Sequence, residues 1–141
     1  MKRSWVFLLA VSLLATGAYA QTLSFGLGDA ELDASLNELN VSAKLDLRTF
    51  SAEVTLQWGT PTAQVSAALA QGLQPAEVYL AASLAQLSGK SLDLVINTYK
   101  KDKKAGWGSV AKSLGIKPGS KEFKALKDKT KGSANKAKKT K

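Results

Sequence analysis

Residues 106–113 (GWGSVAKS) come closest to a motif with known chemistry. A phosphate-binding loop has the pattern G-x-x-x-x-G-K-[ST], and Lys112 and Ser113 match its last two positions. The second glycine, which lets backbone N–H groups wrap a phosphate, is replaced by Ala111, and a lysine-rich segment stands where a buried strand must precede the loop. The missing strand also argues against a dinucleotide site of the type G-x-G-x-x-[GA]. We therefore expect no cofactor.

A helix-turn-helix is the second interpretation of this region. Residues 109–116 (SVAKSLGI) resemble its first helix and turn, but the two later positions that need apolar residues hold Lys121 and Lys124. The apolar residues come two places late, which rotates the second helix by about 200° relative to that motif. A packed helical corner remains. Together with the tryptophan at residue 58, it gives the expected structural core: Trp58, Trp107, Val110, Leu114, Phe123 and Leu126.

Catalytic and metal-binding chemistry is restricted by composition. The chain has no Cys and no His, which removes thiolate nucleophiles, the usual zinc ligands and the commonest general base. An acidic run at residues 29–33 starts like a calcium loop but lacks the glycine and the final glutamate of that loop. The remaining candidates for chemistry are not paired by spacing: Glu77, Tyr79, Lys90, Asp93 and Tyr99. We predict no catalytic site, no metal site and no enzyme activity.

The first twenty residues have the three parts of a secretory signal peptide. A basic start (residues 2–3) is followed by an apolar run (residues 5–15) and by small residues at Ala18 and Ala20. The run is shorter than the roughly 20 residues of a membrane span. We expect cleavage before Gln21 and a bacterial protein exported to the periplasm or the medium, with no transmembrane span after cleavage.

Charge is divided sharply along the chain. Residues 21–99 hold three basic and eight acidic residues, whereas residues 100–141 hold fifteen lysines and three acidic residues. Such asymmetry predicts a folded body with a basic arm. We assign polyanion binding to the lysines of the last fourteen residues: Lys129, Lys131, Lys136, Lys138, Lys139 and Lys141.

Apolar and polar residues alternate in residues 39–47 and again in 50–58. Period two predicts strands, and a turn at Arg48-Thr49 would put all ten apolar side chains on one face of a hairpin. On its other face Lys44 would lie opposite Glu53. An isolated hairpin is marginal and needs a cover. The predicted fold is therefore α+β, an N-terminal β-hairpin packed on a small bundle of four to five short helices.

Helical signals fill the segment after the hairpin. One helix is expected over 62–72, a second from Pro75 to near Gly89, a third from about Ser91, and two short ones from 107 to 127. Gln74 and Glu77 have the spacing of a capping box for the second helix, and Ser120 is expected to cap the last one. From Asp128 the chain has no large apolar residue, which predicts disorder. The domains are then a signal peptide (1–20), an irregular lead-in (21–38), an α+β domain (39–127) and a disordered basic tail (128–141).

The order of these segments resembles a group of exported bacterial proteins of uncharacterised function. The likeness covers most of residues 28–132 and is carried by GDAELDASLNELNVSAKLDL, then FSAEVTL, then the motif GWGxxAKxLGIKPGSxEF and a Lys/Gly-rich tail. Similar sequences often have His after the Glu-Phe pair, where this chain has Lys124. The resemblance implies export and supplies no activity.

Together these features predict an exported, non-catalytic interaction protein of the bacterial envelope. Its basic tail would bind anionic polymers such as lipopolysaccharide, teichoic acid or extracellular nucleic acid, without sequence-specific DNA recognition. The alternatives are a tail kept for solubility, a small periplasmic enzyme, an assembly subunit that pairs through the hairpin edge, and a helix-turn-helix protein. Ending the chain at Leu126 should leave thermal stability almost unchanged and abolish retention on heparin or lipopolysaccharide at low salt.

Overall fold

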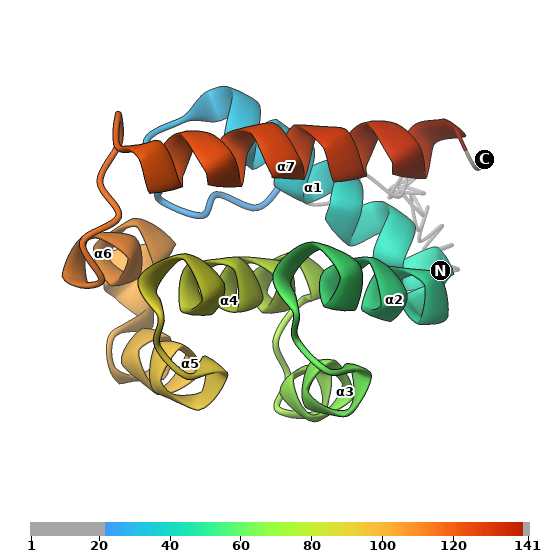
Figure 1. Cartoon of the computed structure of the whole chain (residues 1–141), viewed down its shortest axis with the longest axis horizontal. Coiled ribbons are helices and arrows are strands. Elements are labelled where there is room, and N and C mark those ends of the chain that lie inside the picture. The colour runs from blue at the N-terminus through green and yellow to red at the C-terminus, as the bar shows by residue number, and fades with distance from the viewer. Residues whose placement is uncertain (1–21, 140–141) are drawn as a thin grey trace, which may run out of the picture.

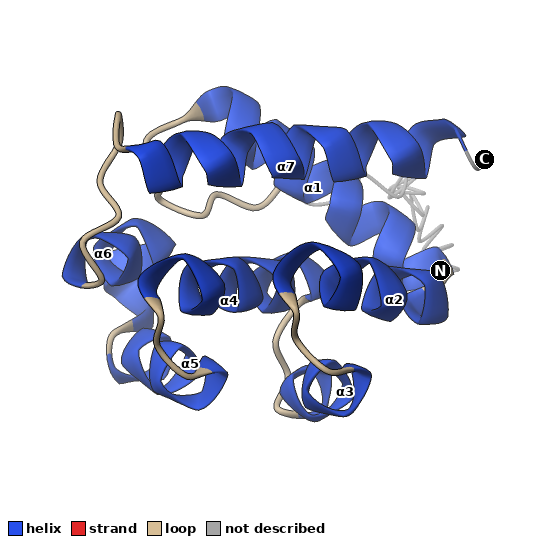
Figure 2. Ribbon diagram, viewed as in Figure 1, coloured by secondary structure: helices blue, strands red, loops and turns tan. Residues whose placement is uncertain are grey.

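A computed structural model describes residues 22–139, and these residues fold entirely as helices and loops, without a strand (Figures 1 and 2). A short 3₁₀ turn, η1, accompanies the helices. In chain order the elements are α1 (Ala30–Leu45), α2 (Leu47–Trp58), α3 (Thr62–Ala70), α4 (Pro75–Ser88), α5 (Leu92–Lys101), η1 (Lys103–Ala105), α6 (Gly106–Ser113) and α7 (Lys121–Lys139).

The helices form a bundle around α4. Helix α4 contacts α1, α2, α3 and α5, and α7 lies along α1 on the opposite side from α3 and α5 (Figure 1). Helix α6 closes the end of the bundle at which α5 ends and α7 begins. Ten of the eleven residues 75–85 of α4 are buried, all except Glu77, which is the pattern of a helix surrounded by others. The predicted helical bundle is confirmed.

The predicted β-hairpin over 39–58 is wrong. Residues 39 and 43 belong to the buried face of α1, and Phe50, Val54 and Trp58 form the buried face of α2, at the i, i+4, i+8 spacing of a helix. The other five apolar residues that the hairpin would have buried are exposed in the helices, and the most exposed are Leu45 and Leu56, at 75% and 83%. Because the described residues contain no hairpin, the predicted α+β class and the alternative of assembly through a hairpin edge are wrong as well.

Capping explains why the chain turns from one helix into the next at Asp46. Its carboxylate accepts hydrogen bonds from the Thr49 backbone N–H (3.0 Å) and hydroxyl (2.6 Å), which starts α2. Asp29 caps α1 in the same way by accepting from the Leu32 N–H (2.9 Å). The expected cross-strand pairing of Lys44 with Glu53 is wrong, because the two residues lie on helices α1 and α2, and the ion-pair partner of Glu53 is Lys136 on α7, at 3.6 Å.

The predicted disorder from Asp128 is also wrong as far as Lys139. The chain continues as α7, which is anchored at its start by buried Phe123 and Leu126 and further along by three small residues, Thr130, Ser133 and Ala134. Small residues allow the helix to approach its neighbours closely, so a segment without large apolar side chains still packs on the body.

The predicted signal peptide lies outside the described residues. Within residues 22–139, no helix combines the length and the apolar composition that crossing a bilayer requires.

Candidate functional site

Lysines in the second half of α7 are paired with acidic residues of the body. Lys131 Nζ lies 2.8 Å from Glu31 Oε1, and Lys138 Nζ lies 2.8 Å from Glu38 Oε1, both on α1. Lys136 Nζ lies 3.6 Å from Glu53 Oε1 on α2. The pairs to α1 run in register, which shows that α1 and α7 are parallel. The predicted polyanion-binding segment is therefore turned in part toward its own acidic residues.

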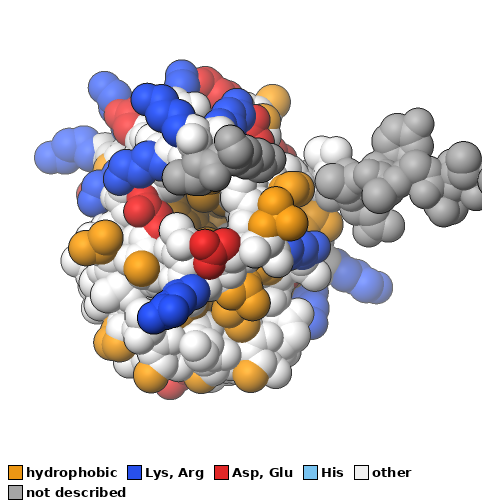
Figure 3. All heavy atoms as spheres, turned by 90° about the vertical axis from the view of Figure 1, so that its right-hand side faces the viewer, with side chains coloured by type: hydrophobic (Ala, Val, Ile, Leu, Met, Phe, Trp, Pro, Cys, Tyr) orange, Lys and Arg blue, Asp and Glu red, His pale blue; other side chains and the backbone are white. Residues whose placement is uncertain are grey.

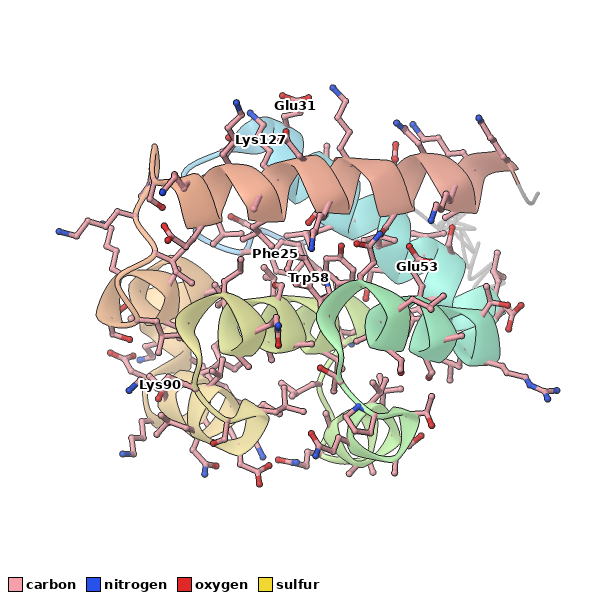
Figure 4. The ribbon with its side chains drawn as sticks, viewed as in Figure 1. Phe25, Glu31, Glu53, Trp58, Lys90 and Lys127 are labelled. Carbon is pink, nitrogen blue, oxygen red and sulfur yellow. The ribbon has the colours of Figure 1, made fainter. Side chains whose placement is uncertain are left out.

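A second ionic cluster fixes the first half of α7. Lys127 Nζ lies 3.0 Å from Asp29 Oδ2 and 3.1 Å from Glu31 Oε2 (Figure 4). The pKa of Glu31 is lowered by Lys131 and Lys127, and that of Asp29 by the Leu32 N–H and then by Lys127. The same contacts raise the pKa values of Lys127 and Lys131. Both ions of each pair therefore stay charged near neutral pH.

The remaining tail lysines have different surroundings. Lys129 Nζ lies 4.6 Å from the ring centre of Trp58, a cation–π contact with a side chain that is 2% exposed. Lys139 is exposed and has no ion pair within residues 22–139, and Lys141 lies outside the described residues. Of the six predicted polyanion-binding lysines, three are ion-paired and one covers an aromatic ring.

A larger set of lysines without ion pairs lies at the other end of the molecule. These residues belong to α5, η1, α6, the loop after α6 and the start of α7, which gather at one end of the bundle (Figure 1). All are exposed, and no ion pair within residues 22–139 includes any of them. We call this set the basic end: Lys100, Lys101, Lys103, Lys104, Lys112, Lys117, Lys121 and Lys124.

Few acidic residues oppose the basic end. Residues 100–124 contain only Asp102 and Glu122. Asp102 is occupied locally, since its carboxylate accepts from the Ala105 N–H at 3.2 Å at the start of η1. Lys100 donates to Gln71, the neutral residue that directly follows α3. Eight lysines against two carboxylates make the local charge strongly positive.

The corner at residues 106–108 fixes the helices that carry the basic end. Trp107 is 2% exposed and stacks on Tyr99, with ring centres 4.1 Å apart and planes at 13°. Its Nε1 donates to Glu77 Oε2 (3.2 Å), and its backbone N–H donates to the Phe25 carbonyl (3.0 Å). These contacts join α4, α5, α6 and the lead-in, so the lysines stand on a rigid support.

Glycine is required at residue 108 because the lead-in passes directly over it. A Cβ built on Gly108 would lie 1.9 Å from the Gly26 carbonyl oxygen. Gly106 has φ +75°, in the left-handed region that favours glycine, and turns the chain into α6. The motif that resembles a phosphate loop is thus used for backbone packing. The predicted core residues of this region are buried, except that Leu114 is half-buried.

Among the candidates for chemistry, Glu77 and Tyr99 are neighbours, and both contact Trp107. Glu77 accepts from the Gln74 N–H with Oε1 (3.0 Å), as the capping-box pattern predicts, and from Trp107 with Oε2. Asp93 and Lys90 are exposed, while Tyr79 is buried. Burial and the neighbouring Glu77 raise the pKa of Tyr99 to about 12, which removes it as an acid or base near neutral pH. Residues 22–139 also contain no cluster of metal-ligating side chains.

Comparisons with protein-family models, curated proteins and solved structures found no match.

Sequence analysis missed the ion pairs between α1 and α7, although a signal was present. Glu31 and Glu38 are seven residues apart, and so are Lys131 and Lys138. A spacing of seven returns to the same side of a helix after two turns, so two such series of opposite charge can pair along parallel helices. The spacing indicates a pair of helices only if both segments are helical, whereas residues 21–38 are predicted as an irregular lead-in and residues 128–141 as a disordered tail.

Proposed function

We propose that this protein is an exported, non-catalytic interaction protein that binds anionic polymers of the bacterial envelope through its basic end. The observation that carries the proposal is the group of eight exposed lysines between residues 100 and 124, which have no ion pair. Apart from Lys100, which donates to Gln71, these lysines can meet phosphate or sulfate groups without first breaking a side-chain contact within the described residues. Binding by this set releases counterions from the polymer, which drives association.

The chemistry of the basic end favours recognition by charge alone. All its cationic residues are lysines, and an ammonium group acts as a point charge without the bidentate geometry of arginine. The neighbouring aromatic side chains, Trp107 and Tyr99, stack on each other, and Trp107 is buried. No stacking platform for bases is therefore available there. Lipopolysaccharide, teichoic acid and extracellular nucleic acid remain the candidate polymers.

The tail lysines contribute less in this proposal than sequence analysis predicts. Lys131, Lys136 and Lys138 already have carboxylate partners, so a polymer phosphate would replace an existing contact and add little. The other three lysines of the predicted tail site are Lys129, Lys139 and Lys141. We infer that the tail lysines serve mainly to attach α7 to α1 and α2.

Two variants with equal charge separate these roles. In the first, six lysines of the basic end become Gln: Lys103, Lys104, Lys112, Lys117, Lys121 and Lys124. In the second, six tail lysines become Gln: Lys129, Lys131, Lys136, Lys138, Lys139 and Lys141. Both lose the same formal charge. On a heparin or lipopolysaccharide column, the basic-end variant should elute at much lower salt than the tail variant. Equal elution would mean that only net charge matters.

Export has its own test. Mass spectrometry of the protein from the periplasm or the medium of a bacterial host should find Gln21 as the first residue. A chain that keeps its first twenty residues and stays in the cytoplasm would contradict this part of the proposal.

A further inference from the structure

A hollow opens at the end of the molecule opposite the basic end. It lies between the last turns of α1, the first half of α2 and the last turns of α7, and its volume is about 570 Å³. Figure 3 faces this end, and hydrophobic side chains are visible inside the hollow, with charged side chains around it. Small-molecule sites in proteins usually enclose about 300–1,000 Å³. The hollow has the size of such a site.

The hollow has an apolar floor. Leu39 and Ala43 of α1 and Phe50 of α2 line it and belong to the buried core, while Leu45 extends the apolar surface to an exposed position. An alkyl chain or a small ring placed there would cover hydrocarbon that otherwise faces water.

The carboxylate of Glu53 lies beside this apolar surface and is held in one orientation by its neighbours. Glu53 Oε1 accepts from Ser133 Oγ (3.0 Å) and from Gln57 Nε2 (3.2 Å) and lies 3.6 Å from Lys136 Nζ. Ser133 is itself buried, with its hydroxyl 3.4 Å from that of Tyr79. All these contacts of Glu53 within the described residues fall on Oε1. Its Oε2 atom is therefore the one that can accept from a bound molecule, and the carboxylate is already oriented.

The charge around the hollow selects the kind of molecule. Its lining includes two carboxylates, Asp46 and Glu53, against one ammonium, Lys136. The hydrogen bonds from Thr49 lower the pKa of Asp46, which keeps that carboxylate ionised. The balance favours a cation and opposes an anion, in contrast to the basic end.

We propose that this hollow binds a small amphipathic amine, with its apolar body on Leu39, Ala43 and Phe50 and its ammonium group on Glu53. The proposal does not depend on polyanion binding, which uses the other end of the molecule. A charged hydrogen bond from the ammonium to Glu53 would give the orientation, and burial of the apolar body would give most of the affinity.

The test uses n-octylammonium as the probe, with n-octanol and n-octanoate of equal chain length as controls. Backbone amide NMR shifts of the purified protein should change around Ala43, Phe50 and Ser133, and octylammonium should bind more tightly than the two controls. Octanoate binding as tight as that of octylammonium, or shifts that cluster elsewhere, would overturn the proposal.

Two variants of the polar wall should act with opposite sign. Glu53→Gln should weaken octylammonium binding about tenfold, because a charged hydrogen bond becomes a neutral one. Lys136→Gln should strengthen it several-fold, because the competing ammonium is gone. An unchanged affinity in either variant contradicts the assigned role of Glu53.

A variant that fills the hollow keeps the test decisive if Glu53→Gln fails to fold. Ser42→Phe places a ring in the hollow from α1 and should abolish binding of octylammonium and octanol alike. Ser66→Phe, at an exposed position of α3, is the matched control and should leave both affinities unchanged. Circular dichroism of each variant reports whether the fold is intact. Octylammonium binding that persists in folded Ser42→Phe would overturn the proposal.

Discussion

Residues 100–124 and residues 125–139 both carry a large excess of lysine, but the two groups lie in different surroundings. In the first group the lysines are exposed and free of ion pairs. In the second, Lys127, Lys131, Lys136 and Lys138 contact the acidic residues of α1 and α2 at 2.8–3.6 Å. Composition treats the two groups alike, while the structure assigns one to the surface and the other to the attachment of a helix.

The difference teaches that a count of charges does not locate a binding surface. An ion pair lowers the free energy that a lysine gains from a polymer phosphate, since one contact replaces another. An unpaired lysine on a rigid support keeps that gain.

The largest effect is expected from Trp58→Ala and Trp107→Ala. Trp58 lies beneath α7 and packs edge-on against Tyr79, with ring centres 6.0 Å apart, and Trp107 holds the corner under the basic end. Each change should lower the free energy of unfolding by ~3–5 kcal/mol, because both side chains are buried. Urea denaturation measures this loss. An unchanged transition in Trp107→Ala would show that the corner does not support the basic end.

Ending the chain at Leu126 should come next. Sequence analysis predicts no loss of stability, whereas the structure predicts a loss of about 2–4 kcal/mol, comparable to exposing one or two large apolar side chains. The deletion removes the buried residues Thr130, Ser133 and Ala134 and uncovers Trp58. Thermal melting tests it. The tail variant with six Gln keeps these buried residues and loses only the ion pairs, so its melting temperature should fall less than that of the shortened chain. An unchanged melting temperature in the shortened chain would contradict the packing of α7 on the body.

A smaller difference should separate the two tryptophans when each becomes Phe. Trp107 Nε1 donates to Glu77, whereas the buried Nε1 of Trp58 has no hydrogen-bond partner within the described residues. Trp107→Phe leaves Glu77 Oε2 without its donor and should cost about 1–2 kcal/mol more than Trp58→Phe. Equal losses in urea denaturation would mean that the Glu77 contact does not strengthen the corner.

The smallest effect concerns pH. The pKa values of Asp29 and Glu31 are lowered from 3.8 and 4.5, so their stabilisation is present above those values and is lost as the pH falls through the lowered pKa values. The raised pKa values of Lys127 and Lys131 give stabilisation that is present below 10.5 and is lost as the pH rises through them.

Unfolding by urea at a series of pH values measures both limbs. Lys127→Gln should flatten the acid limb, whereas Lys124→Gln, on the same helix without an ion pair, should leave it unchanged. The same flattening in both variants would show that the pairs to Asp29 and Glu31 do not hold α7.

Sequence analysis located the helices from residue 62 onward because their capping signals are local. Pro75 with Gln74 and Glu77, and Ser120 before α7, mark helix starts that the structure contains. The corner residue Trp107 was placed in the core for a similar reason, since glycines flank it and apolar residues follow at helical spacing.

Residues 39–58 were misassigned because two periodicities overlap there. A helical face at Phe50, Val54 and Trp58 is a subset of every second residue, so exposed Ala52 and Leu56 complete an apparent strand. Polar Asn40 hides the helical face of α1, since it is buried and accepts from the Ala76 N–H at 3.0 Å. Asn40 and Ala76 are 36 residues apart in the sequence, so no local pattern reveals their contact.

The sequence does not reveal the basic end, because this surface is defined by which lysines lack an ion pair in the folded chain. Its lysines were counted in the basic arm, and only the packing of α7 on α1 and α2 decides which of the fifteen lysines in residues 100–141 are ion-paired. Disorder was predicted for the tail from the absence of large apolar residues, a rule that fails where small residues face a complementary acidic surface.

The most direct test of the basic end is the salt dependence of binding to one defined polyanion, a short duplex DNA of mixed sequence. The slope of log K against log salt counts the phosphates that lysines neutralise, at roughly 0.9 per contact. The variant with six Gln in the tail should keep a slope close to that of the unmodified protein, and the variant with six Gln in the basic end should lose most of it. Equal slopes in the two variants, or the larger loss in the tail variant, would contradict the account.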